Sequence, residues 1–285
     1  MYKLNLGCSL GCFDTVIHED KTYDILPLFD TFKQNVKALK ENGFNSIELC
    51  PMAGWNYEEE QKYFPLVTKF LDVIKEEGIT LNSVHLPFAL SFWNFASLDD
   101  NKRKFSVEHA KWAMKFFEKV NLKYFVIHPG LRPKTVEERL PMLDQLVKSM
   151  KDICESTPVT ICIENMTSVG LLNQTSEAKY VLERVPKLMM VIDVNHPFIE
   201  TPEDYILKIG DRVKALHVSD RDNERERHCM PGDGVINFNN VIGALEKIGY
   251  KGEFTYEVSI DKNQTPSKIR TNFDTLFENY NNSKK

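Results

Sequence analysis

The chain alternates short apolar runs, each closed by a polar residue, with longer amphipathic stretches. Runs of this length and hydrophobicity are typical of strands that are buried on both faces. The longer stretches carry apolar residues at helical spacing and predict helices over 26–43, 64–78 and 107–120, the first two ending at a glycine. The predicted strands are LNLGC (4–8), SIELC (46–50), LNSVHL (81–86), YFVIH (124–128), VTICIEN (159–165), MMVIDVNH (189–196), KALHVS (214–219) and FTYEVS (254–259).

The spacing of these runs indicates one repeated unit. The polar residues that close them recur about every 35 residues, and one strand–helix–strand step takes roughly 30 residues or more. Eight such steps close most economically into a single (β/α)8 TIM barrel, with its active site at the C-terminal ends of the strands. A doubly wound open sheet is the alternative, but GCSLGC (7–12) lacks the GxGxxG spacing that it predicts. We expect the barrel over 1–278 and a frayed polar tail over 279–285.

The composition is that of an ordinary globular protein, 42% hydrophobic and 27% charged, with a net charge of −5. No apolar stretch approaches the roughly 18 residues that span a bilayer, and the N-terminus has no signal-peptide pattern. The six cysteines show no CxxC pair, so we expect free thiols in the cytoplasm. The acidic balance and the lack of a Lys/Arg stripe argue against a nucleic-acid partner. The composition is also compatible with a homo-oligomer.

Chemistry-bearing side chains gather at the predicted strand ends, where four of the seven histidines lie. Three carboxylates also lie at strand ends. The runs before them are so apolar that an unpaired charge there would be costly to bury. Each residue alone could be a hydrogen-bonded core group, but all strand ends of a parallel barrel face one mouth. Imidazole and carboxylate without thiolate form a ligand set for Zn²⁺, Mn²⁺, Co²⁺ or Fe²⁺. The residues are His85, His128, His196, His217, Glu164, Asp193 and Glu257.

Three further features are more ambiguous. Glu48 lies near the end of the second run. We expect it to be a structural residue, a substrate contact or a residue that acts through a metal ligand. His109, inside a predicted helix, is expected to be structural. The charged segment DRDNERERH (220–228) directly follows the seventh run. It is either a solvated loop or, with CMPGDG (229–234), a lid whose arginines bind a phosphate.

Several motifs together resemble the xylose isomerase-like superfamily of barrels over residues 81–260. That superfamily includes sugar and sugar-phosphate isomerases and epimerases, inosose-processing enzymes and endonuclease IV. The resemblance implies one divalent metal (Mn, Zn, Co or Mg) held by Glu164, Asp193, His217 and Glu257. The motifs that carry it are HPG (128–130), IEN (163–165), IDVNH (192–196), HVSDRD (217–222), RERHCMPGDGVINF (225–238) and YEV (256–258).

The resemblance also implies additional metal ligands. His85 and His128 match two histidines with which endonuclease IV holds another zinc. His196, Glu226 and His228 match the ligands of its third zinc, where that enzyme has Asp in place of Glu. The chain departs from endonuclease IV in ENMTS (164–168), where that enzyme has ENTAG, and in its first strand. It departs from ketohexose epimerases in having Asn at position 223, where they have Arg.

The function that the resemblance implies is a metal-dependent isomerase or epimerase acting on a sugar, sugar phosphate or related polyol through an enediolate. Such chemistry needs a cation that stabilises negative charge and two carboxylates that act as base and acid. Glu164 and Glu257 are predicted to be that catalytic pair. A zinc-dependent phosphodiester hydrolase acting on abasic DNA and a non-catalytic carbohydrate-binding barrel are the alternatives. The residues predicted to bind the carbohydrate are His85, His128, His196, Arg221, Arg225 and His228.

Overall fold

The computed structural model describes residues 1–167, 169–261 and 263–284, and its strands form a closed parallel barrel. Because β1 pairs with both β4 and β12, the sheet has no open edge and the predicted TIM barrel is confirmed over the doubly wound alternative. Each predicted strand corresponds to one barrel strand. The barrel strands are β1 (Asn5–Gly11), β4 (Ser46–Cys50), β5 (Thr80–His85), β6 (Tyr124–Ile127), β7 (Thr160–Glu164), β8 (Met189–Asp193), β9 (Val213–Val218) and β12 (Glu253–Tyr256).

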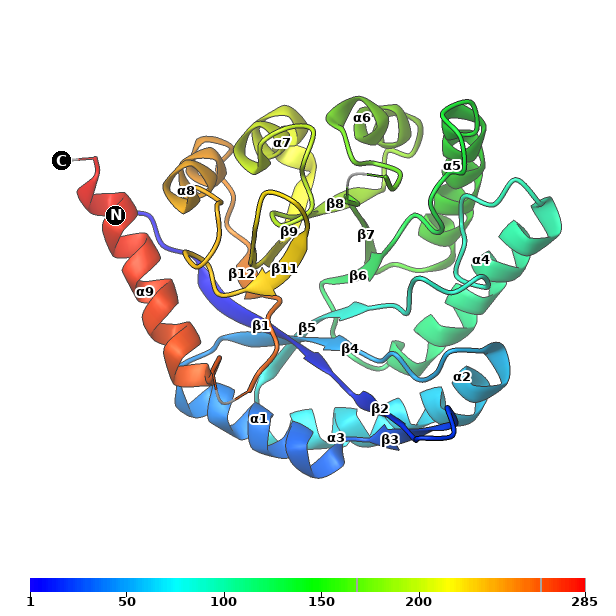
Figure 1. Cartoon of the computed structure of the whole chain (residues 1–285), viewed down its shortest axis with the longest axis horizontal. Helices are drawn as coiled ribbons and strands as arrows, with labels where there is room; N and C mark the ends of the chain where they lie inside the picture. The colour runs from blue at the N-terminus through cyan, green and yellow to red at the C-terminus, as the bar shows by residue number, and fades with distance from the viewer. Residues whose placement is uncertain (168, 262, 285) are drawn as a thin grey trace.

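Helices surround the strand ring on its outside (Figure 1). Along the described chain, none of them combines the length and the hydrophobicity that crossing a membrane would need. The helices are α1 (Phe29–Glu41), α2 (Tyr57–Tyr63), α3 (Val67–Glu77), α4 (Asp100–Met114), α5 (Arg139–Ser156), α6 (Thr175–Arg184), α7 (Pro202–Ile209), α8 (Phe238–Lys247) and α9 (Pro266–Asn282), with 3₁₀ turns at Phe64–Leu66, Lys115–Phe117 and Gly210–Arg212.

Two helix starts differ from the prediction. Helix α4 begins at Asp100 rather than 107, because the Asp99 carboxylate accepts hydrogen bonds from the backbone N–H groups of Asn101 and Lys102 (3.0 and 3.2 Å). The helix predicted over 26–43 begins only at Phe29, because the residues before it form a hairpin. In that hairpin the antiparallel strands β2 (Phe13–Ile17) and β3 (Tyr23–Pro27) pair, which the sequence analysis did not predict.

The alternation of side chains along the strands decides which residues face the barrel interior. One buried cluster, made of alternate residues of β6 to β9, fills that interior, while the intervening residues belong to the larger core under the helices. Glu164, Asp193 and His217 each lie two residues beyond a member of the interior cluster. They therefore continue the inward-facing series to the C-terminal mouth of the barrel. The interior cluster comprises Tyr124, Val126, Cys162, Val191 and Ala215.

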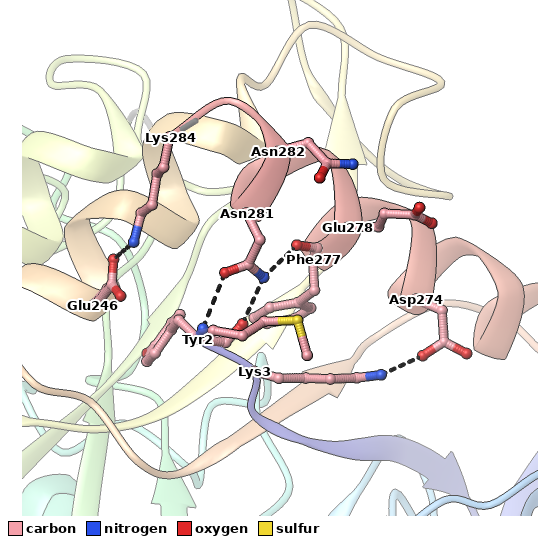
Figure 2. A pocket seen from close by; sticks show the side chains of 10 residues that line it. Tyr2, Lys3, Glu246, Asp274, Phe277, Glu278, Asn281, Asn282 and Lys284 are labelled. Carbon is pink, nitrogen blue, oxygen red and sulfur yellow. Dashed lines mark hydrogen bonds and ion pairs between the residues drawn. The ribbon is translucent and has the colours of Figure 1, made fainter.

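The C-terminal segment is helical where the sequence analysis expected a frayed tail. Helix α9 continues through Asn282 because Phe277 and Tyr280 are buried, and only Lys285 lies outside the described residues. The backbone N–H of Tyr2 donates to Asn281 Oδ1 (3.0 Å), and Asn281 Nδ2 donates to the Tyr2 carbonyl (2.9 Å), as Figure 2 shows. These residues line a surface pocket of about 620 Å³ between the first residues and α9. The last turn thus ties both chain ends together.

Replacing Asn281 by Ala tests this attachment. Asn281→Ala removes both hydrogen bonds to Tyr2, so we expect the free energy of unfolding to fall by about 1–2 kcal/mol in urea titrations. Asn279→Ala, on an exposed position of the same helix, is the matched control and should change stability by less than about 0.5 kcal/mol. Equal losses in both variants would show that the pair of hydrogen bonds does not stabilise the chain ends.

Candidate active site

Four ligand-type side chains converge at the mouth of the barrel. Glu164 and Asp193 end β7 and β8, His217 lies in β9, and Glu257 directly follows β12. One ligand atom of each lies within 4.8 Å of the others. His217 Nδ1 is 3.3 Å from both Glu164 Oε1 and Glu257 Oε2. The structure therefore brings together the four residues that the family resemblance indicated as metal ligands.

The unpaired polar atoms of this group fit a divalent cation. Asp193 Oδ2, His217 Nδ1 and Glu257 Oε2 are buried, and none of the described residues forms a hydrogen bond with them. A buried polar atom without a partner costs on the order of 1–3 kcal/mol, so three that converge on one point call for an explanation. Two or three carboxylates with one imidazole are a donor set that Zn²⁺, Mn²⁺ or Co²⁺ accepts.

Backbone carbonyls orient three of the other histidines in the same way. Nδ1 lies 2.8 Å from the Leu86 carbonyl in His85, 2.6 Å from the Asn165 carbonyl in His196 and 3.0 Å from the Glu257 carbonyl in His228. An Nδ1–H that donates to a carbonyl leaves Nε2 as the lone-pair nitrogen. In all three rings Nε2 therefore faces the carboxylates of the mouth.

A second group of ligand atoms lies beside the first. Nε2 of His85 is 3.1 Å and Nε2 of His128 is 3.3 Å from the same oxygen, Glu164 Oε2. His85, Glu164 and His217 also have ligand atoms within 4.8 Å of one another. Glu164 is thus shared between the central group and the two histidines that were predicted as additional ligands.

A third group lies on the other side of Asp193, which forms a cluster of ligand atoms with His196 and His228. His196 Nε2 is 3.2 Å from Asp193 Oδ2 and 3.5 Å from Glu226 Oε1, the oxygen that His228 Nε2 also contacts closely. Four of the five residues predicted as additional ligands therefore adjoin the central four, and the fifth, Glu226, contacts His196 and His228.

The segment that carries Glu226 and His228 has regular secondary structure and is held by hydrogen bonds. It forms the short hairpin β10 (Asp220–Arg221) and β11 (Glu226–Cys229). The buried Asp220 carboxylate accepts hydrogen bonds from the backbone N–H groups of Gly232 (2.9 Å), Gly234 (3.0 Å) and Ile236 (3.1 Å). His228 has a φ of 46°, a left-handed conformation that is uncommon for residues other than glycine and recurs at functional sites.

The predicted phosphate-binding arginines have other partners in this structure. Arg221 Nη2 donates to the Pro197 carbonyl (2.7 Å), and its guanidinium lies 3.9 Å over the Phe198 ring. Arg227 pairs with Asp222, and Arg225 is exposed. Arg221 therefore braces the segment after β8, and a substrate contact by Arg221 or Arg225 stays a prediction.

The two predicted catalytic carboxylates have opposite electrostatic surroundings. Burial opposes ionisation of Glu164, but His217 and His128 more than offset it and hold the pKa of Glu164 well below its usual value. Burial, followed by the negative charges of Asp193 and Glu164, raises the pKa of Glu257 to about 7, although His217 opposes the shift. Environments that shift the pKa values of two carboxyl groups in opposite directions are typical of acid–base pairs.

The histidines of the third group supply positive charge to the cluster. Burial disfavours the imidazolium form of His196, but Asp193 and Glu226 outweigh burial and raise the pKa of His196 to about 10. Burial is likewise outweighed at His228, where Glu226 and Asp193 raise the pKa to about 9. In the protein alone, protonated histidines therefore balance the carboxylates.

The structure adds supporting residues that sequence reasoning left open or missed. Asn165 donates from Nδ2 to the Asp193 carbonyl (3.0 Å) and accepts from the Asp193 N–H (2.8 Å), which joins the ends of β7 and β8. Its position directly after Glu164 in IEN was the only signal. Glu48 lies in the mouth, 2.9 Å from His217. His109 is buried in a pair with Glu60 (3.0 Å), as expected for a structural residue.

Several known proteins are similar to this chain. Probable endonuclease 4 of Mycoplasmopsis pulmonis is 27% identical over 237 residues, 75% of this chain and 81% of that protein. Fructoselysine 3-epimerase of Escherichia coli O157:H7 is 24% identical over 179 residues, 58% of this chain and 63% of that protein. The crystal structure of a D-tagatose 3-epimerase-like protein shares the fold, with a TM-score of 0.74 at 19% identity, over 99% of this chain and 100% of that one. A family model for xylose isomerase-like TIM barrels matches residues 36–278, and the chain therefore belongs to that family.

Proposed function

We propose that the protein is a divalent-metal-dependent isomerase or epimerase that acts on a sugar, a sugar phosphate or a related polyol. The observation that carries the proposal is the mouth itself, where four ligand-type side chains bring three unpaired buried atoms together. Two of the four are the carboxyl groups of Glu164 and Glu257, whose pKa values are shifted in opposite directions. The family includes proteins named as sugar epimerases, among them the fructoselysine 3-epimerase relative. One cation, Mn²⁺, Zn²⁺, Co²⁺ or Mg²⁺, is the proposed cofactor.

The proposed roles follow from the positions of the side chains. Glu164, Asp193, His217 and Glu257 would hold the cation, which supplies positive charge that stabilises negative charge on the substrate oxygens. Glu164 is ionised and removes a carbon-bound proton next to the carbonyl group. Glu257 would deliver a proton to that carbon from the opposite side.

The remaining side chains of the mouth are proposed as substrate contacts. The imidazoles lie beside the catalytic carboxylates, where they can hold hydroxyl groups, and the arginines lie on the hairpin that follows β9. The proposed partner is a small carbohydrate, and the proposed location is the cytoplasm, in line with six free cysteines. The substrate contacts are His85, His128, His196, His228, Arg221 and Arg225.

A second candidate function is zinc-dependent hydrolysis of a phosphodiester in abasic DNA. One observation favours it, because His85, His128, His196 and His228 lie beside the central ligands, and Glu226 contacts the last two of them. A single-metal isomerase has no evident need for so many additional ligands. The relative named as a probable endonuclease 4 supports this alternative.

Metal content separates the two candidates. Protein purified without chelators should contain one equivalent of Mn, Co, Mg or Zn by mass spectrometry if it is an isomerase or epimerase. Two or three equivalents of zinc, together with cleavage of an abasic duplex, would overturn our proposal in favour of the hydrolase. Asp193→Asn should remove the metal because it neutralises a central ligand, whereas Asp144→Asn, on the outer helix α5, should leave metal content unchanged.

Replacing Glu257 by Gln tests the proposed chemistry. Proton removal next to a carbonyl group in D₂O labels that carbon with deuterium, which NMR detects across a panel of ketoses and ketose phosphates. Glu257→Gln keeps the side-chain volume but removes proton transfer, so exchange and turnover should fall about 10²–10⁴-fold. Glu183→Gln, exposed on α6, should keep full activity. More than a tenth of the wild-type rate in Glu257→Gln would place Glu257 outside the chemistry.

The same variant gives a pH test in the metal-free protein. The folded-state pKa of Glu257 is about 7, above the unfolded value of about 4.3, so ionising it costs stability progressively between these values and fully above pH 7. Metal-free Glu257→Gln should therefore melt at a higher temperature than wild type at pH 8, with little difference at pH 4.5. Calorimetric melts in a chelating buffer measure this. A destabilised variant at pH 8 would contradict the raised pKa.

A further inference from the structure

His217 is oriented differently from the other histidines of the mouth. His85, His196 and His228 direct Nδ1 toward a backbone carbonyl and present Nε2 to the site. His217 presents Nδ1 to Glu164 and Glu257, and its Nε2 lies 2.9 Å from a carboxylate oxygen, Glu48 Oε1. This contact is a close ion pair whose geometry is not that of a hydrogen bond. A central ligand is therefore oriented by an ionisable side chain rather than by the backbone.

Glu48 is held in place for this contact. It lies on β4, two strands away from β9 around the barrel, and reaches His217 through the interior. Its other oxygen, Oε2, accepts a hydrogen bond from Ser83 Oγ at 2.8 Å, and Ser83 is the register partner of Glu48 on β5. Glu48, Ser83 and His217 are each at most 1% exposed. The contact is thus sheltered from water. In such a low-dielectric environment a charge on Glu48 interacts strongly with its neighbours.

Glu48 does not belong to the ligand groups themselves. Within the described residues, none of the three sets of ligand atoms that lie within 4.8 Å of one another includes Glu48. His217 stands between Glu48 and the centre of the site, since its two ring nitrogens face opposite ways. The contact that links Glu48 to the central ligand group therefore passes through the imidazole ring of His217.

We propose that Glu48 is a positioning residue that fixes His217 with its proton on Nε2, so that the Nδ1 lone pair points to the metal. This inference deepens the proposed function and rests on its metal dependence. A carboxylate that accepts the second N–H of a metal-bound imidazole fixes the ring orientation and raises the basicity of the ligand nitrogen. The hydrogen bond from Ser83 holds the Glu48 carboxylate in this orientation.

Co²⁺ binding to the purified full-length protein tests the proposal. Glu48→Gln keeps shape and a hydrogen-bond acceptor but removes the charge, and it should weaken Co²⁺ binding about 10–100-fold in chelator-competition titrations. Glu48→Ala should weaken binding further. It should also abolish the slowly exchanging Nε2–H resonance of Co²⁺-bound His217, which Glu48→Gln should retain. Ser83→Ala, the milder change, should weaken binding in the same direction.

Glu60→Gln is a matched control. Glu60 is also a fully buried carboxylate paired with a histidine, His109 at 3.0 Å, but it lies on α2 and accepts a further hydrogen bond from Trp93 (2.9 Å). Glu60→Gln should alter thermal stability without altering Co²⁺ affinity. This separates the effect on His217 from the general cost of neutralising a buried glutamate.

The outcomes distinguish this inference from the proposed function. If wild type binds Co²⁺ and both Glu48→Gln and Ser83→Ala bind it equally tightly, Glu48 is not a positioning residue, while the proposed metal dependence stands. If wild type itself binds no Co²⁺, the proposed function fails, and the role of Glu48 fails with it. Should Glu48→Gln fail to fold, an unchanged affinity in Ser83→Ala overturns the inference.

Discussion

Charge balance inside a closed barrel mouth is the constraint on which the rest of this structure depends. Glu48, Glu164 and Asp193 are buried, and Glu257 beside them is partly buried. Two like charges 4 Å apart repel by about 4 kcal/mol at the effective dielectric of a protein. Such a cluster persists only if positive charge enters it. Protonated histidines provide that charge in the protein alone, and a divalent cation in place of those protons gives the site its proposed chemistry.

The fold meets this constraint by fixing each group from outside the mouth. Backbone carbonyls contact Nδ1 of His85, His196 and His228, and the Glu48 carboxylate lies 2.9 Å from His217. Asn165 ties the ends of β7 and β8 together, and Asp220 anchors the segment that brings Glu226 and His228 over the barrel. Three buried atoms without a hydrogen bond, Asp193 Oδ2, His217 Nδ1 and Glu257 Oε2, belong to residues of the same ligand group. These contacts position the side chains of the site, and such positioning in advance of the reaction is what electrostatic catalysis requires.

The same constellation serves two kinds of chemistry, because both stabilise negative charge on oxygen atoms with bound cations. An isomerase needs one cation and a pair of carboxyl groups with different acidity, and the surroundings of Glu164 and Glu257 provide such a pair. A phosphodiester hydrolase needs several cations, and His85, His128 and His228 extend the ligand set in that direction. The choice between them therefore depends on how many cations the mouth retains.

The local pattern of the sequence determined the barrel and most of its mouth, because strand length, side-chain alternation and regular spacing are properties of neighbouring residues. These properties placed Glu164, Asp193 and His217 at strand ends, and closure of the barrel made them neighbours. Only the tertiary structure decided what depends on residues far apart in the chain. The β2–β3 hairpin shortened the helix predicted from 26, the contact of Tyr2 with Asn281 accompanies an ordered last turn of α9, and Arg221 turned to Pro197. The role of Glu48 belongs to the same class, because its contact with His217 crosses the barrel interior and leaves no periodic trace in the sequence.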